Sequence, residues 1–361
     1  MRILFVDSGF DWRGGQYQVL NLATELRSRG HEMLLVCQRG GALESRSRAR
    51  GLSVEPARMR GDADFVAWSR IGGILRAFQP NVVHAHTGRA HAVALGATFF
   101  HDVEALLVTR RVASPIRKAF VNRLKYSRLV SAFVAISDFV AETLVNAGVP
   151  RGRIRVIPSC VRVEDFASPE PADDARRELG LSDDDPVVLN VGSLSKEKAQ
   201  EDILSVARIV SGQMPRVRFL IAGEGRLLHK LKGRARELGV DSIVSFLGFR
   251  DDVPRLMRLS QVFIFPSESE GLGTSVLQAM AARLPVVACR TGGTKEIVKE
   301  GATGFLVETH DVSHMAEAVV NLLRDPQLAS SFGEAGRAVA QDFSFSRAGA
   351  LHEELYQELA G

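Results

Sequence analysis

Short apolar runs of three to five residues recur along the chain, and longer amphipathic segments separate them. In the first half these runs cover 3–6, 33–37, 82–85, 105–109, 132–136 and 155–157, and in the second half 187–191, 218–222, 243–246, 262–265, 286–288 and 304–307. Segments such as 17–29, 202–212 and 227–238 repeat their apolar residues at helical spacing. Because strands that are apolar throughout belong to sheets covered on both faces, the alternation predicts an α/β fold with parallel, doubly wound sheets.

The chain is long enough to form more than one such sheet. It has 361 residues, whereas a single hydrophobic core stops growing at about 250–300 residues. We therefore expect a first Rossmann-like domain over 1–165, a second over 166–343, and a C-terminal helix over 344–361 that packs back on the first domain. No apolar run approaches the ~20 residues that cross a bilayer, and the three cysteines are far apart, as in a reduced cytoplasmic protein.

Positive charge is concentrated in the first half of the chain. Residues 1–160 hold 23 Lys and Arg against 12 Asp and Glu, a balance of +11, and the remainder carries −7. The stretch 110–128 has no acidic residue, and its cations include Arg110, Arg111, Arg117, Lys118, Arg123 and Lys125. Such a segment fits an anionic acceptor or an anionic membrane surface, and equally an ordinary solvated helix face. Sparse aromatic residues and the lack of a nucleic-acid motif argue against a nucleic-acid partner.

An acidic residue and two glycines follow the apolar run 262–265 and precede a helical pattern over 276–282. The order of this segment is Glu270, Gly271, Leu272, Gly273 and Thr274. Open α/β sheets bind ligands at the carboxyl ends of their strands, and the N-terminus of a helix attracts anions. A carboxylate beside free helix amides suits a ligand that carries both hydroxyls and phosphate, which is the chemistry of a nucleotide sugar.

Other strand ends carry further candidates for the same ligand. They are Gly14 and Gly15 at a helix start, His86 after 82–85, Ser193 with Lys196 and Lys198 after 187–191, Gly223 with Glu224 after 218–222, and Phe249 with Arg250 after 243–246. Each also has an ordinary structural explanation, as turn glycines, a buried histidine, solvated lysines, or a loop whose Asp251 or Asp252 caps a helix. The sequence alone leaves both interpretations open.

Two common cofactor sites fit the sequence poorly. The Gly-x-Gly patterns at 223–225 and 271–273 lack a third glycine, because Leu228 and Val276 stand at that position, and this weighs against a dinucleotide. No group of residues has the spacing typical of a metal site. We therefore expect no cofactor and no metal.

Taken together, these motifs resemble family-4 retaining glycosyltransferases of the GT-B architecture. The resemblance covers nearly the whole chain and rests on the order of the motifs. They are Gly14-Gly15, Arg29-Gly30-His31-Glu32, Val83-His84-Ala85-His86, Ile157-Pro158-Ser159, Ala222-Gly223-Glu224-Gly225, Pro266-Ser267 with Glu270-Gly271, and Gly292-Gly293 with Glu296-Ile297. The resemblance implies two Rossmann-like domains that face a central cleft, with the donor held mainly by the second domain and the acceptor by the first.

The resemblance also implies roles for single residues. Glu270 matches a glutamate that contacts the donor sugar, Lys198 a lysine that neutralises the diphosphate, Gly15 a backbone contact to that diphosphate, and His86 a histidine near the sugar. With Lys198, Glu270 and His86 as the catalytic residues, the expected donor-binding residues are Gly14, Gly15, Ser193, Gly223, Glu224, Phe249, Arg250, Gly271, Leu272, Gly273, Thr274 and Gln278.

Two positions depart from the family pattern. Gln278 stands where a glutamate usually binds the ribose hydroxyls, and the loss of that charge-assisted hydrogen bond costs roughly 1–2 kcal/mol. Ser193 stands where an arginine usually faces the phosphates. These departures motivate an alternative function, that of a weakly active or non-catalytic protein that binds a sugar nucleotide.

The expected function is transfer of a sugar, with retention of configuration, from a UDP- or GDP-linked donor. The acceptor would be a glycan, a lipopolysaccharide core or a lipid-linked molecule in cell-envelope synthesis, and the basic run would contact the inner face of an anionic membrane. A sugar-nucleotide epimerase fits the Glu270 motif less well, and a nicotinamide oxidoreductase lacks its glycine fingerprint.

Overall fold

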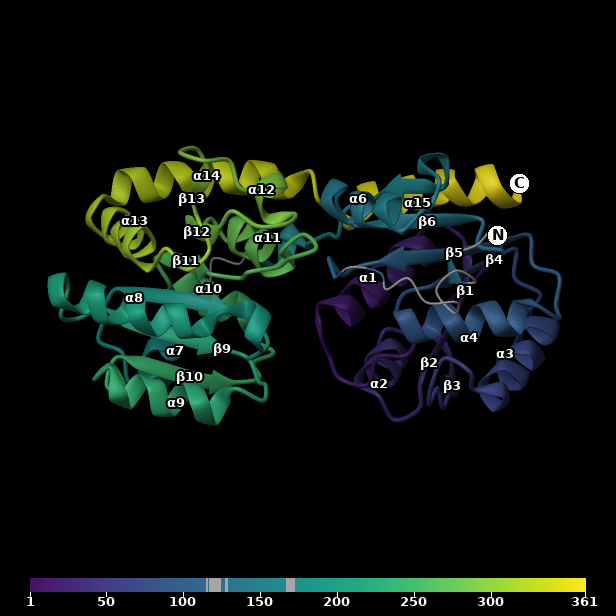
Figure 1. Ribbon diagram of the computed structural model, residues 1–361, viewed down its shortest axis with the longest axis horizontal. Coiled ribbons are helices and arrows are strands. Elements are labelled where there is room, and N and C mark those ends of the chain that lie inside the picture. The colour runs from purple at the N-terminus through teal and green to yellow at the C-terminus, as the bar shows by residue number, and fades with distance from the viewer. Residues whose placement is uncertain (115, 117–124, 127–128, 167–172) are drawn as a thin grey trace. The chain divides into compact units, whose positions relative to one another are not determined.

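The computed structural model describes residues 1–114, 116, 125–126, 129–166 and 173–361 (Figure 1). The chain forms two units. Unit 1 comprises Met1–Cys160 and Phe345–Gly361, and unit 2 comprises Val161–Ser344. The backbone therefore passes from one unit to the other twice.

A seven-stranded parallel sheet forms the centre of unit 1, with the strand order β3-β2-β1-β4-β5-β6-β7. Its strands are β1 (Arg2–Asp7), β2 (Glu32–Gln38), β3 (Ser53–Ala57), β4 (Val82–Ala85), β5 (Ala105–Arg110), β6 (Ala132–Ala135) and β7 (Ile154–Val156). The strand order reverses between β1 and β4, and ligands of such sheets bind beyond the carboxyl ends of the strands at a reversal of this kind. We call the side of each sheet where its strands end the carboxyl edge.

Helices cover both faces of this sheet, and its central strands are therefore buried on both sides. They are α1 (Gly14–Ser28), α2 (Ala42–Ala49), α3 (Phe65–Phe78), α4 (Gly88–Thr98), α6 (Asp138–Asn146), the short η1 (Arg151–Arg153) and the C-terminal α15 (Phe345–Ala360). Alternate residues such as Ile3 and Phe5 share one hydrophobic cluster with α1 and α15. A buried hydrogen bond of 2.6 Å between His84 Nδ1 and Tyr356 Oη attaches α15 to β4.

Unit 2 is built around a six-stranded parallel sheet in the order β10-β9-β8-β11-β12-β13. Its strands are β8 (Val187–Val191), β9 (Arg218–Ala222), β10 (Val244–Gly248), β11 (Val262–Phe265), β12 (Val286–Cys289) and β13 (Gly304–Val307). Its helices are η2 (Val163–Phe166), α7 (Asp173–Glu178), η3 (Lys196–Lys198), α8 (Gln200–Gln213), α9 (Leu228–Glu237), α10 (Val253–Leu259), α11 (Thr274–Ala281), α12 (Thr294–Ile297), α13 (Val312–Arg324) and α14 (Pro326–Gln341). Here the strand order reverses between β8 and β11.

The predicted fold class, α/β with two doubly wound parallel sheets, is confirmed. Every apolar run named above overlaps a strand, but sequence analysis missed β3. This strand lies at the edge of its sheet, contains Pro56, and has only Val54 and Ala57 fully buried. A short edge strand of this composition has too little apolar periodicity to be recognised.

Candidate active site

The centre of the candidate site in unit 2 is an ion pair between Lys198 and Glu270. Lys198 ends the η3 helix after β8, and Glu270 follows the neighbouring strand β11. Lys198 Nζ donates to Glu270 Oε1, and the two side chains are only 22% and 12% exposed. Ser267 Oγ lies 2.6 Å from the same carboxylate oxygen. The parallel sheet thus brings two predicted residues together as a cation and a carboxylate that are largely shielded from water.

Two glycines fix the backbone that carries this carboxylate. Gly292 and Gly293 follow β12, and a Cβ atom at Gly292 would lie 2.0 Å from the Glu270 carbonyl oxygen. A Cβ atom at Gly293 would lie 2.3 Å from the carbonyl oxygen of Gly271. The Gly293 N–H also donates to Glu270 O over 3.1 Å. Any side chain at these two positions would therefore displace the Glu270 segment.

Similar backbone contacts join the loops that follow β8, β9 and β10. The Gly223 N–H donates to Gly248 O over 2.7 Å, and a Cβ atom at Gly223 would lie 1.9 Å from Gly192 O. In the β8 loop, the Ser193 carbonyl accepts a hydrogen bond of 2.8 Å from Gln200 Nε2. The loop that leads to Lys198 is therefore held by its neighbours at the carboxyl edge.

Two of the predicted donor-binding residues, Phe249 and Arg250, lie on the loop after β10. Phe249 is 45% exposed, and its N–H donates to Glu224 Oε1 over 3.4 Å. Arg250 makes two hydrogen bonds of 2.7 Å with Asp252 and one of 3.0 Å with Glu178. These carboxylates raise the pKa of Arg250 above its usual value. The exposed Phe249 ring is thus available for stacking, whereas the Arg250 guanidinium already binds two carboxylates of its own unit.

Helix α11 begins at the same edge. Its N-terminal residue Thr274 and Gln278 are partly exposed, while Gly271 and Leu272 are buried. Gly273, which precedes the helix, has a φ of 96° that favours glycine. Among the described residues no side chain caps this helix, and its first turn has no acidic residue. Its first N–H groups are therefore suited to an anion.

In unit 1, Gly14 and Gly15 are the first two residues of α1. Asp7, at the end of β1, accepts hydrogen bonds of 3.0 Å from Gln16 Nε2 and 2.7 Å from the Gly9 N–H. Burial raises the pKa of Asp7 above its usual value. The start of α1 is thereby attached to the carboxyl edge of the first sheet.

His86 lies below the surface of unit 1. It is 3% exposed, and its ring centroid is 4.4 Å from that of Phe5 and 4.3 Å from that of His84. Within the described part of the chain, neither of its ring nitrogens has a hydrogen-bond partner. Burial lowers the pKa of His84 and of His86 well below 6.5, so both imidazoles are uncharged at neutral pH.

The basic run contacts its own unit wherever the structure describes it. Arg110 Nη1 donates to Tyr126 Oη over 3.0 Å. Lys125, which is 8% exposed, donates to Asp62 Oδ2 over 2.9 Å. Arg111 lies beside the start of α1 and is considered below. The other three predicted cations, Arg117, Lys118 and Arg123, lie outside the described residues.

Sequence analysis missed several polar side chains at these edges. Asp7 is recognisable afterwards as a carboxylate that ends an otherwise apolar strand. In unit 2, His310 has a φ of 64°, and its Nδ1 lies 2.9 Å from Asp202 and its Nε2 3.5 Å from Glu268. No motif links these three positions, which become neighbours only through the strand order.

No group of three or more His, Cys, Asp or Glu side chains among the described residues is arranged to hold a metal ion. None of the described helices combines the length and the apolar character that crossing a bilayer requires.

Two family sequence models match the chain. The one described as "Glycosyltransferase Family 4" matches residues 12–165, and the one described as "Glycosyl transferases group 1" matches residues 171–339. The two matches correspond closely to the first and second sheets.

Among curated proteins, the putative glycosyltransferase EpsD of Bacillus subtilis is 32% identical over 201 residues, which are 55% of this chain and 53% of EpsD. The GDP-mannose-dependent alpha-(1-6)-phosphatidylinositol monomannoside mannosyltransferase of Mycolicibacterium smegmatis is 32% identical over 238 residues, 63% of this chain and 62% of the relative. The chain spans about half the length of the first curated relatives that it matches.

Solved structures share the fold over almost the entire chain. Alr3699/HepE of Anabaena, in complex with UDP-glucose, matches with a TM-score of 0.90 and 23% identity and covers 99% of this chain and 100% of that one. A glycosyltransferase of Rickettsia africae matches with a TM-score of 0.87 and 20% identity, covering 99% and 98% of the two chains.

Proposed function

Because the chain belongs to the glycosyl transferases of group 1 and Family 4 and has the GT-B fold expected from its sequence, we propose that it transfers a sugar from a nucleoside diphosphate sugar to an acceptor hydroxyl. The bond between the anomeric carbon and the diphosphate breaks, a bond to the acceptor oxygen forms, and the acceptor proton passes to the leaving phosphate. The configuration of the anomeric carbon is retained.

The observation that carries this proposal is the shielded pair of Lys198 and Glu270 at the carboxyl edge of unit 2. As the sugar–phosphate bond breaks, negative charge develops on the diphosphate. Lys198 and the N–H groups that begin α11 supply positive charge where it develops, which is the form of catalysis that removes most from such a barrier. Glu270 accepts hydrogen bonds from sugar hydroxyls. In unit 1, the backbone of Gly15 at the start of α1 is proposed to contact phosphate.

The proposed donors are UDP- and GDP-linked sugars. One similar structure is a complex with UDP-glucose, and one relative is named as GDP-mannose-dependent. Both support this proposal. The proposed acceptor is a glycan, a lipopolysaccharide core or a lipid-linked molecule of the cell envelope. A lipid-linked acceptor would bring the protein to the inner face of a membrane, and the excess of positive charge in residues 1–160 favours that encounter.

The test is turnover of a purified donor by matched lysine variants. With UDP-glucose and GDP-mannose offered separately, release of nucleoside diphosphate is measured by mass spectrometry during prolonged incubation. Lys198→Ala should lower the rate by about 100-fold or more, because it removes one group that stabilises developing charge. Lys230→Ala, which removes an exposed lysine paired with Glu201 in the same unit, should keep the wild-type rate. A Lys198→Ala rate within twofold of wild type would contradict the proposed role.

A second candidate function is sugar-nucleotide binding without useful transfer, and Ser193 and Gln278 favour it. Both positions lack the charged residue typical of the family, so donor affinity and leaving-group stabilisation are both reduced. The same incubation separates the two functions: saturable binding of a donor with no release of diphosphate by the wild-type protein would support the second candidate and exclude the first.

A further inference from the structure

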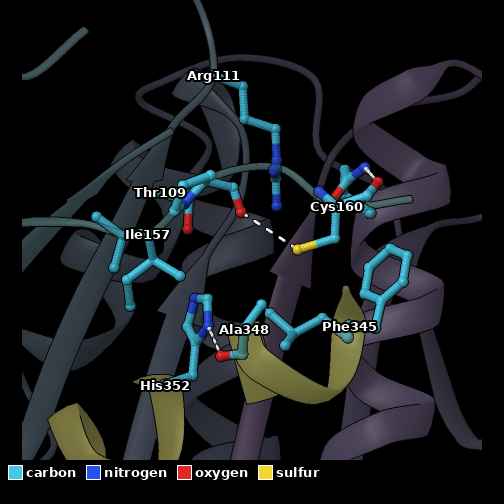
Figure 2. Close-up of a pocket in the computed structure, with 11 residues that line it drawn as sticks. Thr109, Arg111, Ile157, Cys160, Phe345, Ala348 and His352 are labelled. Atoms are coloured by element: carbon cyan, nitrogen blue, oxygen red, sulfur yellow. Dashed lines mark hydrogen bonds between the residues drawn. The ribbon is translucent and has the colours of Figure 1, made fainter. Parts of the chain in front are cut away.

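Arg111 occupies a central position at the carboxyl edge of unit 1. It directly follows β5, and its Nη1 donates to Ser159 Oγ over 3.3 Å. Its aliphatic stem passes α1, because a Cβ atom built at Gly15 would lie 3.9 Å from Arg111 Cδ. Figure 2 shows the side chain entering a small pocket beside Cys160 and above His352. That pocket has a volume of about 10 Å³, room for about one water molecule, so it is too small for a larger ligand of Arg111.

The charge of Arg111 has little compensation from the protein. Among the residues described, Arg111 forms no ion pair, and its buried Nε atom has no hydrogen-bond partner. Burial lowers the pKa of Arg111 to about 10, which leaves the group cationic at neutral pH. Arg111 is half-buried, and a cation in this position with no contacting anion among the described residues is destabilising.

The buried carboxyl group that acts most strongly on this cation is that of Asp7, which raises the pKa of Arg111 without contacting it. Asp7 is fully buried, and its Oδ2 has no hydrogen-bond partner within the described part of unit 1. The two ring nitrogens of His86 also have no hydrogen-bond partner among the described residues. Three strands therefore end in polar atoms that the described chain does not satisfy, and such atoms call for an external partner.

The start of α1 adds donors of the same kind. The residue before the helix is Arg13, and in the described structure no side chain caps α1 and no acidic residue occupies its first turn. The first N–H groups of this 15-residue helix therefore lie free beside the Arg111 stem. A guanidinium fork next to helix amides is the arrangement that binds phosphate oxygens best.

We propose that Arg111 is a further phosphate-binding residue, which holds one phosphoryl group together with the N–H groups at Gly14 and Gly15. This inference rests on the proposed transferase function for the identity of the anion. The phosphoryl group belongs either to the diphosphate of the donor or to a phosphorylated acceptor. The basic residue that sequence analysis placed on an acceptor or membrane surface thus acts inside the site.

The experiment compares Arg111→Met with Arg70→Met, a matched variant that removes an exposed arginine of α3 paired with Glu55. Binding of UDP, GDP and glycerol 3-phosphate is measured by calorimetry. Arg111→Met should weaken at least one of these ligands by about 10-fold or more, because a charge-assisted hydrogen bond is lost. Loss for UDP or GDP identifies the donor diphosphate, and loss for glycerol 3-phosphate alone identifies a phosphorylated acceptor. Arg70→Met should bind like wild type.

Stability separates a binding role from a structural one. Both tryptophans, Trp12 and Trp68, belong to unit 1, so their fluorescence follows the unfolding of this unit. Without added ligand, Arg111→Met should melt at or above the wild-type temperature, because it replaces an uncompensated charge by an apolar side chain. If Arg111→Met does not fold, Arg111→Lys takes its place, and the loss of the guanidinium fork should still weaken binding by several-fold.

The proposal is wrong if the folded variant binds all three ligands as wild type does, or if the wild-type protein binds none of them. Its failure differs from failure of the proposed function. If Lys198→Ala abolishes donor turnover while Arg111→Met leaves phosphate binding intact, the transferase function stands and the role of Arg111 falls. If Arg111→Met weakens glycerol 3-phosphate while the wild-type protein turns over neither donor, Arg111 keeps its role and the transferase function falls.

Discussion

The cationic side chains at the two carboxyl edges differ in whether a carboxylate contacts them. In unit 2, Lys198 is neutralised by Glu270, whereas the described residues of unit 1 give Arg111 one hydrogen bond, of 3.3 Å to a neutral hydroxyl. A diphosphate must therefore compete with Glu270 for Lys198. When phosphate binds Lys198, the Glu270 carboxylate is released and becomes available to sugar hydroxyls. The two events are therefore coupled through this ion pair.

This coupling predicts the behaviour of Glu270→Gln. The amide keeps the size of the side chain but not its charge, so Lys198 becomes more available to phosphate. We expect UDP alone to bind Glu270→Gln about 10-fold more tightly than wild type, which corresponds to about 1.4 kcal/mol, while turnover of a donor sugar falls. Calorimetry with UDP provides the first value and the diphosphate-release assay the second.

Weaker binding of UDP by Glu270→Gln would mean that the carboxylate organises Lys198 for phosphate rather than competing with it. Glu268→Gln is a suitable control, because Glu268 lies on the same loop and contacts His310 instead. Its affinity for UDP should change by less than twofold.

The sequence was informative about residues that occupy strand-end motifs and uninformative about residues whose role depends on burial. Lys198 and Glu270 could both be named, because each follows an apolar run and precedes a helix. Arg111 could only be grouped with its basic neighbours, since no pattern distinguishes an arginine that turns inward from one that stays in solvent. Likewise, the sequence could not show that His86 is enclosed by Phe5 and His84.

At the level of elements, the site depends on turns that touch through their backbones. The glycine turns after β9 and β12 lie so close to the adjacent loops that a methyl group would overlap a carbonyl oxygen. The twelve strands that coincide with apolar runs were predictable, because burial on both faces leaves a plain signal. The contacts between their loops were not, because they depend on which strands become neighbours. The edge strand β3 was missed for the opposite reason, that its burial is slight.

Two alanine substitutions test whether the glycine turn after β12 positions Glu270. Both positions have positive φ angles, but only one of them lies against the Glu270 backbone. Gly292 and Gly301 both have positive φ angles, 47° and 67°. A Cβ atom at Gly292 meets Glu270 O at 2.0 Å, whereas one at Gly301 has no described atom within 4 Å. Gly301→Ala should therefore cost about 1 kcal/mol of backbone strain with turnover unchanged.

Gly292→Ala adds a displacement of the Glu270 segment to the same strain, so we expect turnover to fall by about 10-fold or more. Circular dichroism during urea unfolding measures the stability of each variant, and diphosphate release measures turnover. Equal effects of the two substitutions on turnover would show that the contact with Glu270 does not position the site.

At the scale of the whole molecule, the described part of unit 1 encloses four imidazoles whose pKa burial lowers, those of His84, His86, His91 and His352. Burial lowers the pKa of His91 to about 3 and that of His352 to about 4, and it lowers those of His84 and His86 well below 6.5. In the unfolded chain each of these histidines takes up a proton near pH 6.5. The unfolded state therefore binds more protons than the folded one below that pH, and stability falls as the pH decreases.

We expect each buried histidine to lower the free energy of unfolding by about 2 kcal/mol as the pH falls from 7 to 5. Urea unfolding followed by tryptophan fluorescence, which reports on unit 1 alone, should therefore show a steep loss over this range. In His352→Leu the loss of unfolding free energy should be smaller by the contribution of one histidine, because one titrating group is gone. An identical pH dependence in this variant would mean that His352 accepts a proton in the folded protein.

The return of α15 to the first sheet has a consequence for how the protein is made. On the ribosome, residues 1–160 emerge first, but the partner of His84, Tyr356, is translated after all of unit 2. The later-made unit is thus the first that can be completed, while the earlier one waits with a hydrophobic flank uncovered. A released chain that ends at residue 344 should accordingly carry a finished second half and a first half that still recruits chaperones.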